Sequence, residues 1–146
     1  MERPYCRFIE GGFSTDERGI LQFFNHPFLE SVKRLYIVEN FSTETIRGWH
    51  GHMKEEKFAL ALTGAALFVV CPISAPGRQL VTAEWERVTV LSDRLLWIPA
   101  GCAHGFRCLI PSTRILFFST ATLEESKADD YRWAITENHL WKVENR

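Results

Sequence analysis

The run Arg47-Gly-Trp-His-Gly-His-Met-Lys-Glu-Glu-Lys57 and the later run Pro99-Ala-Gly-Cys-Ala-His104 decide how this sequence folds. The first run carries His50 and His52 at positions i and i+2. Side chains with this spacing face the same side of a strand, so we expect both imidazoles to point into one cavity. Glu56 follows at a spacing that returns a carboxylate from the next strand. In the second run, a Pro-Gly turn delivers the final histidine into a strand.

Short β-rich segments, separated by turn residues, make up most of the remaining chain. They span residues 19–24, 32–38, 58–63, 65–71, 85–91, 95–98 and 114–120. Thr63-Gly64 indicates a tight hairpin, and the stretch 72–77 is the clearest loop. Several short strands at such spacing are typical of an all-β sandwich or barrel. From Leu123 onward the residues are charged and compatible with a helix, so a short C-terminal helix is expected.

Length and charge limit the possible functions. The chain has 146 residues, 46% of them hydrophobic and 24% charged, as in an ordinary soluble domain, and residues 1–146 are interpreted as a single domain. With 17 basic and 18 acidic residues the net charge is −1, which provides no field for binding nucleic acid or a membrane surface.

We expect a cytoplasmic protein, because no targeting signal is recognised and because the cysteines show no disulfide pattern. No apolar stretch reaches the roughly 18 residues of a membrane span. The first five residues do not resemble a signal peptide. Cys6, Cys71, Cys102 and Cys108 show neither a Cys-x-x-Cys spacing nor the density of a disulfide framework, so they are expected to be reduced thiols.

The two histidine runs together resemble the signature motifs of the cupin superfamily, His-x-His-(x)3-Glu and Pro-x-Gly-x-x-His. They occur in the right order on a β-rich chain, about fifty residues apart. The resemblance implies an all-β cupin, a double-stranded β-helix or jelly-roll barrel, with a short C-terminal helix. His26 and His139 lie outside these motifs and are interpreted as ordinary histidines.

A narrower resemblance covers most of the chain. Phe13-Ser-Thr-Asp-Glu-Arg18-Gly-Ile, Arg47-Gly-Trp-His50 and Trp97-Ile-Pro-Ala-Gly-Cys-Ala-His104-Gly-Phe resemble motifs of the dTDP-4-dehydrorhamnose 3,5-epimerase family. The resemblance implies that His50 is the base and that His104 lines the pocket. Arg47 and Lys57 would hold substrate oxygens or phosphate. Arg18 would reach a diphosphate, in that family often one bound by the neighbouring subunit, which implies a homodimer.

The sequence departs from the epimerase pattern at the acid and at the carboxylate. That family has a tyrosine acid in the strand after its Ala-His-Gly-Phe motif, whereas this strand reads Ile115-Leu-Phe-Phe-Ser-Thr120. No Lys-Asp segment follows, so the carboxylate that pairs with the catalytic histidine is not found. Both departures count against a double epimerisation.

The middle of the chain is instead similar to the dTDP-sugar 3,4-ketoisomerases. Lys33-Arg-Leu-Tyr36, followed by Arg47-Gly-Trp-His50-Gly-His52, resembles that family's Lys-Arg-x-Tyr and Arg-Gly-x-His-Ala-His. By this resemblance His50 and His52 shuttle the proton and Tyr36 supports them. The zinc-bearing cupin module of some capsule-sugar reductases has a similar run.

These features predict an isomerase or epimerase that acts on a nucleotide-linked 4-keto-6-deoxy sugar. The reaction starts when a base removes a proton beside a ketone, and a histidine with a pKa near 6.5 suits that task. No cofactor and no metal are expected. Two alternatives remain open: a metal-dependent cupin enzyme that uses His50, His52, Glu56 and His104, and a non-catalytic sugar-binding cupin.

Overall fold

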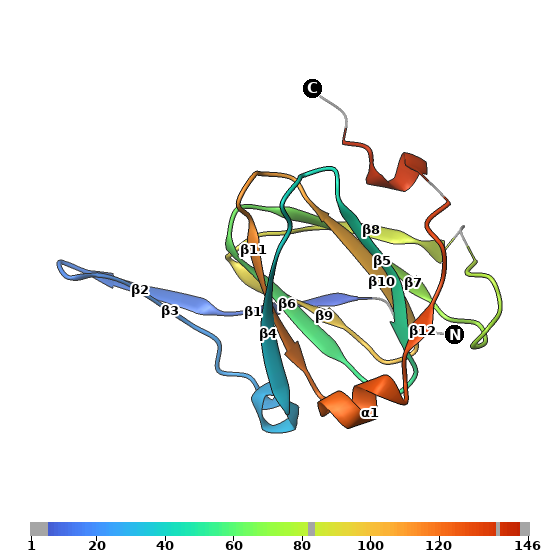
Figure 1. The fold of residues 1–146 in the computed structure, drawn as a ribbon. Helices are drawn as coiled ribbons and strands as arrows, with labels where there is room; N and C mark the ends of the chain where they lie inside the picture. Colours follow the sequence, from blue (N-terminus) through green and yellow to red (C-terminus); the bar gives the residue numbers. More distant parts are fainter. Residues whose placement is uncertain (1–5, 82–83, 137, 144–146) are drawn as a thin grey trace.

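Two five-stranded antiparallel sheets form the body of the protein. The computed structural model describes residues 6–81, 84–136 and 138–143 (Figure 1). In order across the first sheet lie β1 (Arg7–Glu10), β9 (Arg94–Ile98), β6 (Lys57–Thr63), β11 (Arg114–Ser119) and β4 (Arg34–Glu39). Across the second lie β12 (Tyr131–Arg132), β5 (Ile46–His52), β10 (Cys102–Cys108), β7 (Ala66–Pro72) and β8 (Glu86–Val90).

The period-two alternation of side chains separates the barrel interior from its outer faces. On β11, Ile115 and Phe117 belong to the interior cluster, in which Phe68 and Phe106 also pack. Phe118, one residue further along, belongs to a second cluster on the other face of the first sheet. That cluster includes Phe28 of the short helix η1 (Pro27–Ser31), which covers the face.

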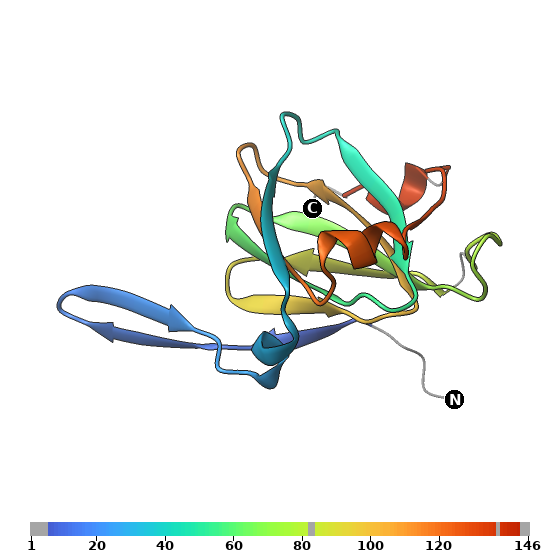
Figure 2. The ribbon, with the colours of Figure 1, turned by 60° about the horizontal axis from the view of Figure 1, so that its bottom comes forward.

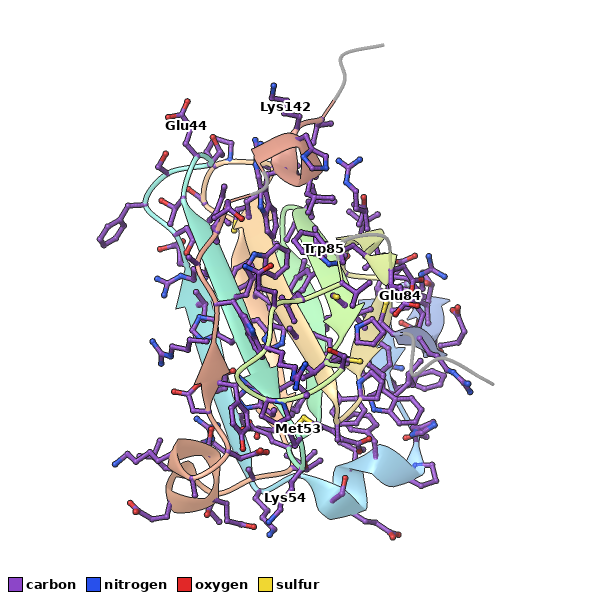
Figure 3. All side chains as sticks on the ribbon, turned by 90° about the vertical axis from the view of Figure 1, so that its right-hand side faces the viewer. Glu44, Met53, Lys54, Glu84, Trp85 and Lys142 are labelled. Carbon is purple, nitrogen blue, oxygen red and sulfur yellow. The ribbon has the colours of Figure 1, made fainter. Side chains whose placement is uncertain are left out.

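A third apolar cluster lies on the outer face of the second sheet. It is built around Trp49, Leu67, Val69 and Trp141. Trp141 ends η3 (Asn138–Trp141), and its ring lies 5.1 Å from that of Trp49. Trp85, labelled in Figure 3, contacts Trp49 edge-on with ring centroids 4.5 Å apart. The C-terminal part of the chain thus supports the strand that carries His50.

A two-stranded hairpin, β2 (Gly12–Asp16) and β3 (Gly19–Phe23), extends away from the barrel. Figures 1 and 2 show it projecting well beyond the two sheets. Every residue of β3 is exposed. The hairpin therefore buries little within its own chain.

The predicted all-β barrel is confirmed, and the predicted strands match observed strands with ends shifted by one or two residues. Gly64 adopts φ +79°, as the expected turn at Thr63-Gly64 requires. The expected short helix in the C-terminal part of the chain is confirmed, and it begins at Leu123. The helix α1 (Leu123–Lys127) ends after five residues, and β12 and η3 follow it. Sequence reasoning missed β1, β2 and β12.

None of the helices in the described ranges has the length and apolar character needed to span a bilayer. The first five residues, on which the expectation of no signal peptide rested, lie outside the described part of the chain.

Replacing Phe68 by alanine is expected to lower the free energy of unfolding by about 3–5 kcal/mol, because the substitution leaves a cavity in the interior cluster. Phe68 is fully buried and stacks on Phe106 with ring centroids 5.0 Å apart. The matched control is Phe41→Ala, at a fully exposed phenylalanine, which should change stability by no more than about 0.5 kcal/mol. Urea denaturation measures both variants, and equal losses would contradict this description of the core.

Candidate functional site

The antiparallel pairing of β5 with β10 brings the three motif histidines together. His50 lies directly opposite His104 in the register, and His52 lies opposite Cys102. The ring centroid of His104 is 6.3 Å from that of His50 and 6.0 Å from that of His52. Two sequence runs about fifty residues apart therefore meet because their strands are neighbours.

An interior cavity of about 150 Å³ opens beside these histidines. Most of the predicted site residues line it, together with three apolar side chains. The lining consists of Tyr36, Val38, Arg47, His50, Lys57, His104, Phe106 and Phe117. This is a small chamber with polar groups on several walls and apolar surface between them.

Tyr36 contributes a phenol to this cavity. It lies on β4, which is the neighbour of β11, the strand that carries the tyrosine acid in the epimerase pattern. Its β4 position is paired with Phe117 on β11, and the two rings stack 5.0 Å apart. The Lys57 ammonium lies 5.5 Å from the Tyr36 ring centroid, and the Arg34 guanidinium lies 5.1 Å from it. Both cations are within cation–π distance of the ring.

Arg47 is oriented by Asn40, a residue that sequence reasoning did not single out. The Arg47 Nε–H donates to the Asn40 Oδ1 over 2.6 Å, and Asn40 is itself buried. A charge-assisted hydrogen bond of this kind restricts the guanidinium to one wall of the cavity.

The carboxylate beside the histidines is Glu55, whereas the sequence pointed to Glu56. The Glu55 side chain is fully buried, and its Oε1 lies 3.4 Å from the His52 Nδ1. It accepts hydrogen bonds from the hydroxyls of Ser119 and Ser126 and from the Arg34 guanidinium. The signal that could have found it is the i+3 spacing from His52.

Glu56 lies beside this cluster without a comparable role. It is half-buried, and its backbone N–H donates to the Thr120 hydroxyl. Within the described ranges, no group of three or more His, Cys, Asp or Glu side chains is placed to hold a metal ion. The predicted alternative set of His50, His52, Glu56 and His104 is therefore not arranged as a metal site.

Burial keeps the three histidines neutral. Burial lowers the pKa of His50, as do the charges of Arg132 and Lys57. Burial and Lys57 likewise lower the pKa of His52, and burial lowers that of His104 well below its ordinary value. Neutral imidazoles near pH 7 are able to accept protons, so the site contains candidate bases.

Asp129 fixes the turn that links β5 to β6. Its carboxylate accepts hydrogen bonds from the backbone N–H groups of Met53, Lys54 and Glu55, at 2.8 to 2.9 Å. Figure 3 places Met53 and Lys54 at the end of the barrel near α1, and Glu44 at the opposite end. Burial alone would raise the pKa of Asp129, but these three hydrogen bonds and nearby His52 lower it on balance.

Arg18 is not part of the cavity of its own chain. It lies in the turn between β2 and β3, where it pairs with Asp16. Its side chain is 84% exposed. A role toward substrate requires a second subunit.

Comparison with known proteins now identifies the family. The sequence model of the dTDP-4-dehydrorhamnose 3,5-epimerase family matches residues 6–141. The chain belongs to this family. It is therefore an enzyme of the dTDP-sugar isomerase and epimerase class, as the motifs predicted. A search of curated protein sequences finds no match.

Solved structures of both enzyme types have the same fold. The dTDP-4-dehydrorhamnose 3,5-epimerase of Bacillus anthracis is 20% identical, with a TM-score of 0.71 over 92% of this chain and 82% of its own. An epimerase of Mycobacterium tuberculosis is 18% identical, with a TM-score of 0.73 over 98% and 76%. A 3,4-ketoisomerase of Thermoanaerobacterium thermosaccharolyticum is 16% identical, with a TM-score of 0.67 over 90% and 89%.

In this family member, Asp129→Asn is expected to lower the free energy of unfolding by about 1–3 kcal/mol near neutral pH, because three charge-assisted hydrogen bonds are weakened. The pKa of Asp129 is depressed in the fold. The stabilisation is therefore present above the unfolded-state pKa and is lost as the pH falls through the folded-state pKa.

Urea denaturation of the wild type and of Asp129→Asn at neutral and acidic pH measures this effect. The difference between their free energies of unfolding should be smaller at acidic pH. The matched control is Asp130→Asn, at the exposed neighbour that pairs with Arg132 on the surface, which should change stability by less than about 1 kcal/mol. A difference that is independent of pH would contradict the proposed role of the Asp129 charge.

Proposed function

We propose that the protein catalyses the 3,4-ketoisomerisation of a dTDP-linked 4-keto-6-deoxy sugar, with His50 as the base. The observation that carries this proposal is the composition of the cavity. His50, Tyr36 and Lys57 share it, and Phe117 occupies the β11 wall where no hydroxyl is present to act as an acid.

Ketoisomerisation moves a ketone between neighbouring carbons. The base takes the proton from sugar carbon 3, and the electrons of that C–H bond form a double bond to carbon 4. Negative charge collects on the ketone oxygen, where a fixed cation such as Lys57 stabilises it. The hydroxyl proton of carbon 3 passes to this oxygen, so that the negative charge moves to the oxygen of carbon 3. The proton taken by the base is then returned to carbon 4, and the carbon 3 oxygen becomes the new ketone while carbon 4 carries the hydroxyl. The reaction has no net redox change, so we propose that no cofactor is needed.

The cavity contains a candidate base and a cation that is able to stabilise the oxyanion. A positioned general base typically contributes about 10²–10⁴-fold, so the remaining acceleration must come from groups that stabilise the oxyanion. Lys57 has a side chain only 12% exposed, which strengthens its field at short range. Tyr36 or His52 returns the proton, and Arg47 and His104 bind the substrate.

The second candidate is epimerisation, which the matching family description favours. Epimerisation returns a proton to the opposite face of the same carbon. It therefore needs an acid across the ring from the base. The position of deuterium in the product distinguishes the two reactions.

We further propose that the enzyme is a homodimer in which Arg18 binds the diphosphate held by the neighbouring subunit. The projecting hairpin exposes apolar side chains at Phe13, Ile20 and Leu21, and such surface marks an interaction site. Cys6, Cys71 and Cys108 are free thiols, and all four cysteines are buried, which suits a reducing compartment, so we propose a cytoplasmic location.

Incubation with dTDP-4-keto-6-deoxyglucose in heavy water, followed by NMR, tests the proposed reaction. The wild type should incorporate deuterium and form the 3-keto isomer. His50→Asn should abolish incorporation while nucleotide-sugar binding survives, because the lost interaction operates in the transition state. His52→Asn should impair isomerisation more than exchange at the first carbon.

The matched control for these variants is His139→Asn, at an exposed histidine of η3 far along the chain, which should behave as wild type. Near-normal exchange by His50→Asn would place the base elsewhere. Epimerised product without the 3-keto isomer would favour the second candidate. No exchange by the wild type with any keto-sugar nucleotide would favour the non-catalytic alternative.

The dimer is tested by light scattering. Ile20→Asp should shift the protein toward monomer, because the substitution puts a charge on the apolar hairpin surface at a side chain 72% exposed. Ile110→Asp, at an exposed isoleucine outside the hairpin, is the matched control and should leave the dimer intact. A monomeric wild type, or a dimer unaffected by Ile20→Asp, would refute the proposed interface.

A further inference from the structure

We infer that Glu55 and the backbone carbonyl of Asp129 hold His52 in the tautomer that carries its proton on Nδ1, so that Nε2 is the proton-accepting atom. Glu55 is then a positioning residue. This inference rests on the proposed function, because it assigns an atom and a supporting carboxylate to the second histidine of the proposed proton relay.

The tautomer follows from the partners of Nδ1. This nitrogen lies 2.7 Å from the carbonyl oxygen of Asp129 and 3.4 Å from the Oε1 of Glu55. A carbonyl oxygen and an ionised carboxylate are acceptors only, so the proton between them must belong to the imidazole. A histidine that donates from Nδ1 and is neutral has an unprotonated Nε2.

Glu55 is ionised in the fold although it is buried. Burial alone would raise the pKa of this carboxyl. Hydrogen bonds from Ser119 and Ser126 and the charge of Lys57 lower it on balance. A buried carboxylate with several donors is stable as an anion and has a fixed orientation.

The Nε2 of His52 lies on the opposite side of the ring from this carboxylate. It is buried, and no protein hydrogen-bond partner is found for it among the described residues. A buried polar atom without a partner calls for an explanation, and a proton-accepting role supplies one for this nitrogen. His52 is not among the residues that line the cavity, but its ring centroid lies 6.0 Å from that of His104, which does line it.

One carboxylate therefore connects the relay histidine with the cations of the site. Its Oε2 lies 3.1 Å from the Arg34 guanidinium and 4.0 Å from the Lys57 ammonium. The charged and titratable groups that face His52 are Glu55, Asp129, Lys57, His50 and His104. Of these, Glu55 and Asp129 favour the protonated imidazole, and burial and Lys57 oppose it.

Long-range proton–nitrogen NMR of the histidine rings tests the tautomer in the unmodified protein without substrate. The His52 resonances should show a protonated Nδ1 and an unprotonated Nε2 near neutral pH. The opposite tautomer would overturn the inference. This measurement needs neither turnover nor a variant, so it stands even where a substitution at Glu55 prevents folding.

Glu55→Gln tests the positioning role. The variant should have a lower His52 titration midpoint, because the favourable negative charge is lost. Its turnover rate should fall by about ten-fold or more with a much smaller change in KM, the direction found when the carboxylate that sets a histidine tautomer is neutralised. The matched control is Glu124→Gln, at an exposed glutamate of α1, which should change neither quantity.

The outcomes separate this inference from the proposed function. One outcome is that His52 is protonated on Nδ1 but the protein exchanges no deuterium with any keto-sugar. This result would support the inferred tautomer and refute the proposed reaction. Exchange by the wild type, with an unchanged His52 titration and full turnover in Glu55→Gln, overturns the positioning role while the reaction stands.

Discussion

The pairing of β5 with β10 is the interaction on which the site depends. Backbone hydrogen bonds place His50 opposite His104, and a shift of one residue would turn the histidines to the other face of the sheet. Trp49 packs on the outer side of the same strand, against Trp85 and Trp141. Alternation along one strand therefore serves two purposes: large aromatic residues hold the register from outside, and imidazoles face inward.

Electrostatics in this site are organised around a buried anion. Lys57 and Arg34 both lie near Tyr36, and the charge of Lys57 also acts on the histidines, so alone they would make this region positive. Glu55 offsets that charge and is satisfied by two hydroxyls from the β11 end and α1. Such a network resists rearrangement, because a carboxylate left without its donors would be costly to bury. The short helix α1 thereby contributes to the active site without lining the cavity.

Both sheets contribute polar groups to a single cavity. Histidines enter from the second sheet, whereas Tyr36 and Lys57 enter from the first. Phe117 lies beside Tyr36 on the first sheet and adds apolar surface to the lining. Under the proposed mechanism, ketoisomerisation and epimerisation share an enolate and differ in the carbon or face to which the proton is returned. The projecting hairpin lies apart from this cavity and exposes apolar side chains.

Local patterns in the sequence determined the class of the fold, the approximate strand boundaries and the histidine motifs. They could do so because strand periodicity and turn chemistry act over a few residues. The choice between Glu55 and Glu56 could not be made in that way. Both follow His52 closely, and only the turn held by Asp129, more than seventy residues further along the chain, determines which carboxylate is buried. Tyr36 likewise stacks on Phe117 through the pairing of β4 with β11, which no local pattern specifies. The sequence by itself determined which chemical groups this protein has. Only the tertiary structure decided which of them share a low-dielectric interior, because burial and hydrogen-bond partners come from segments distant along the chain.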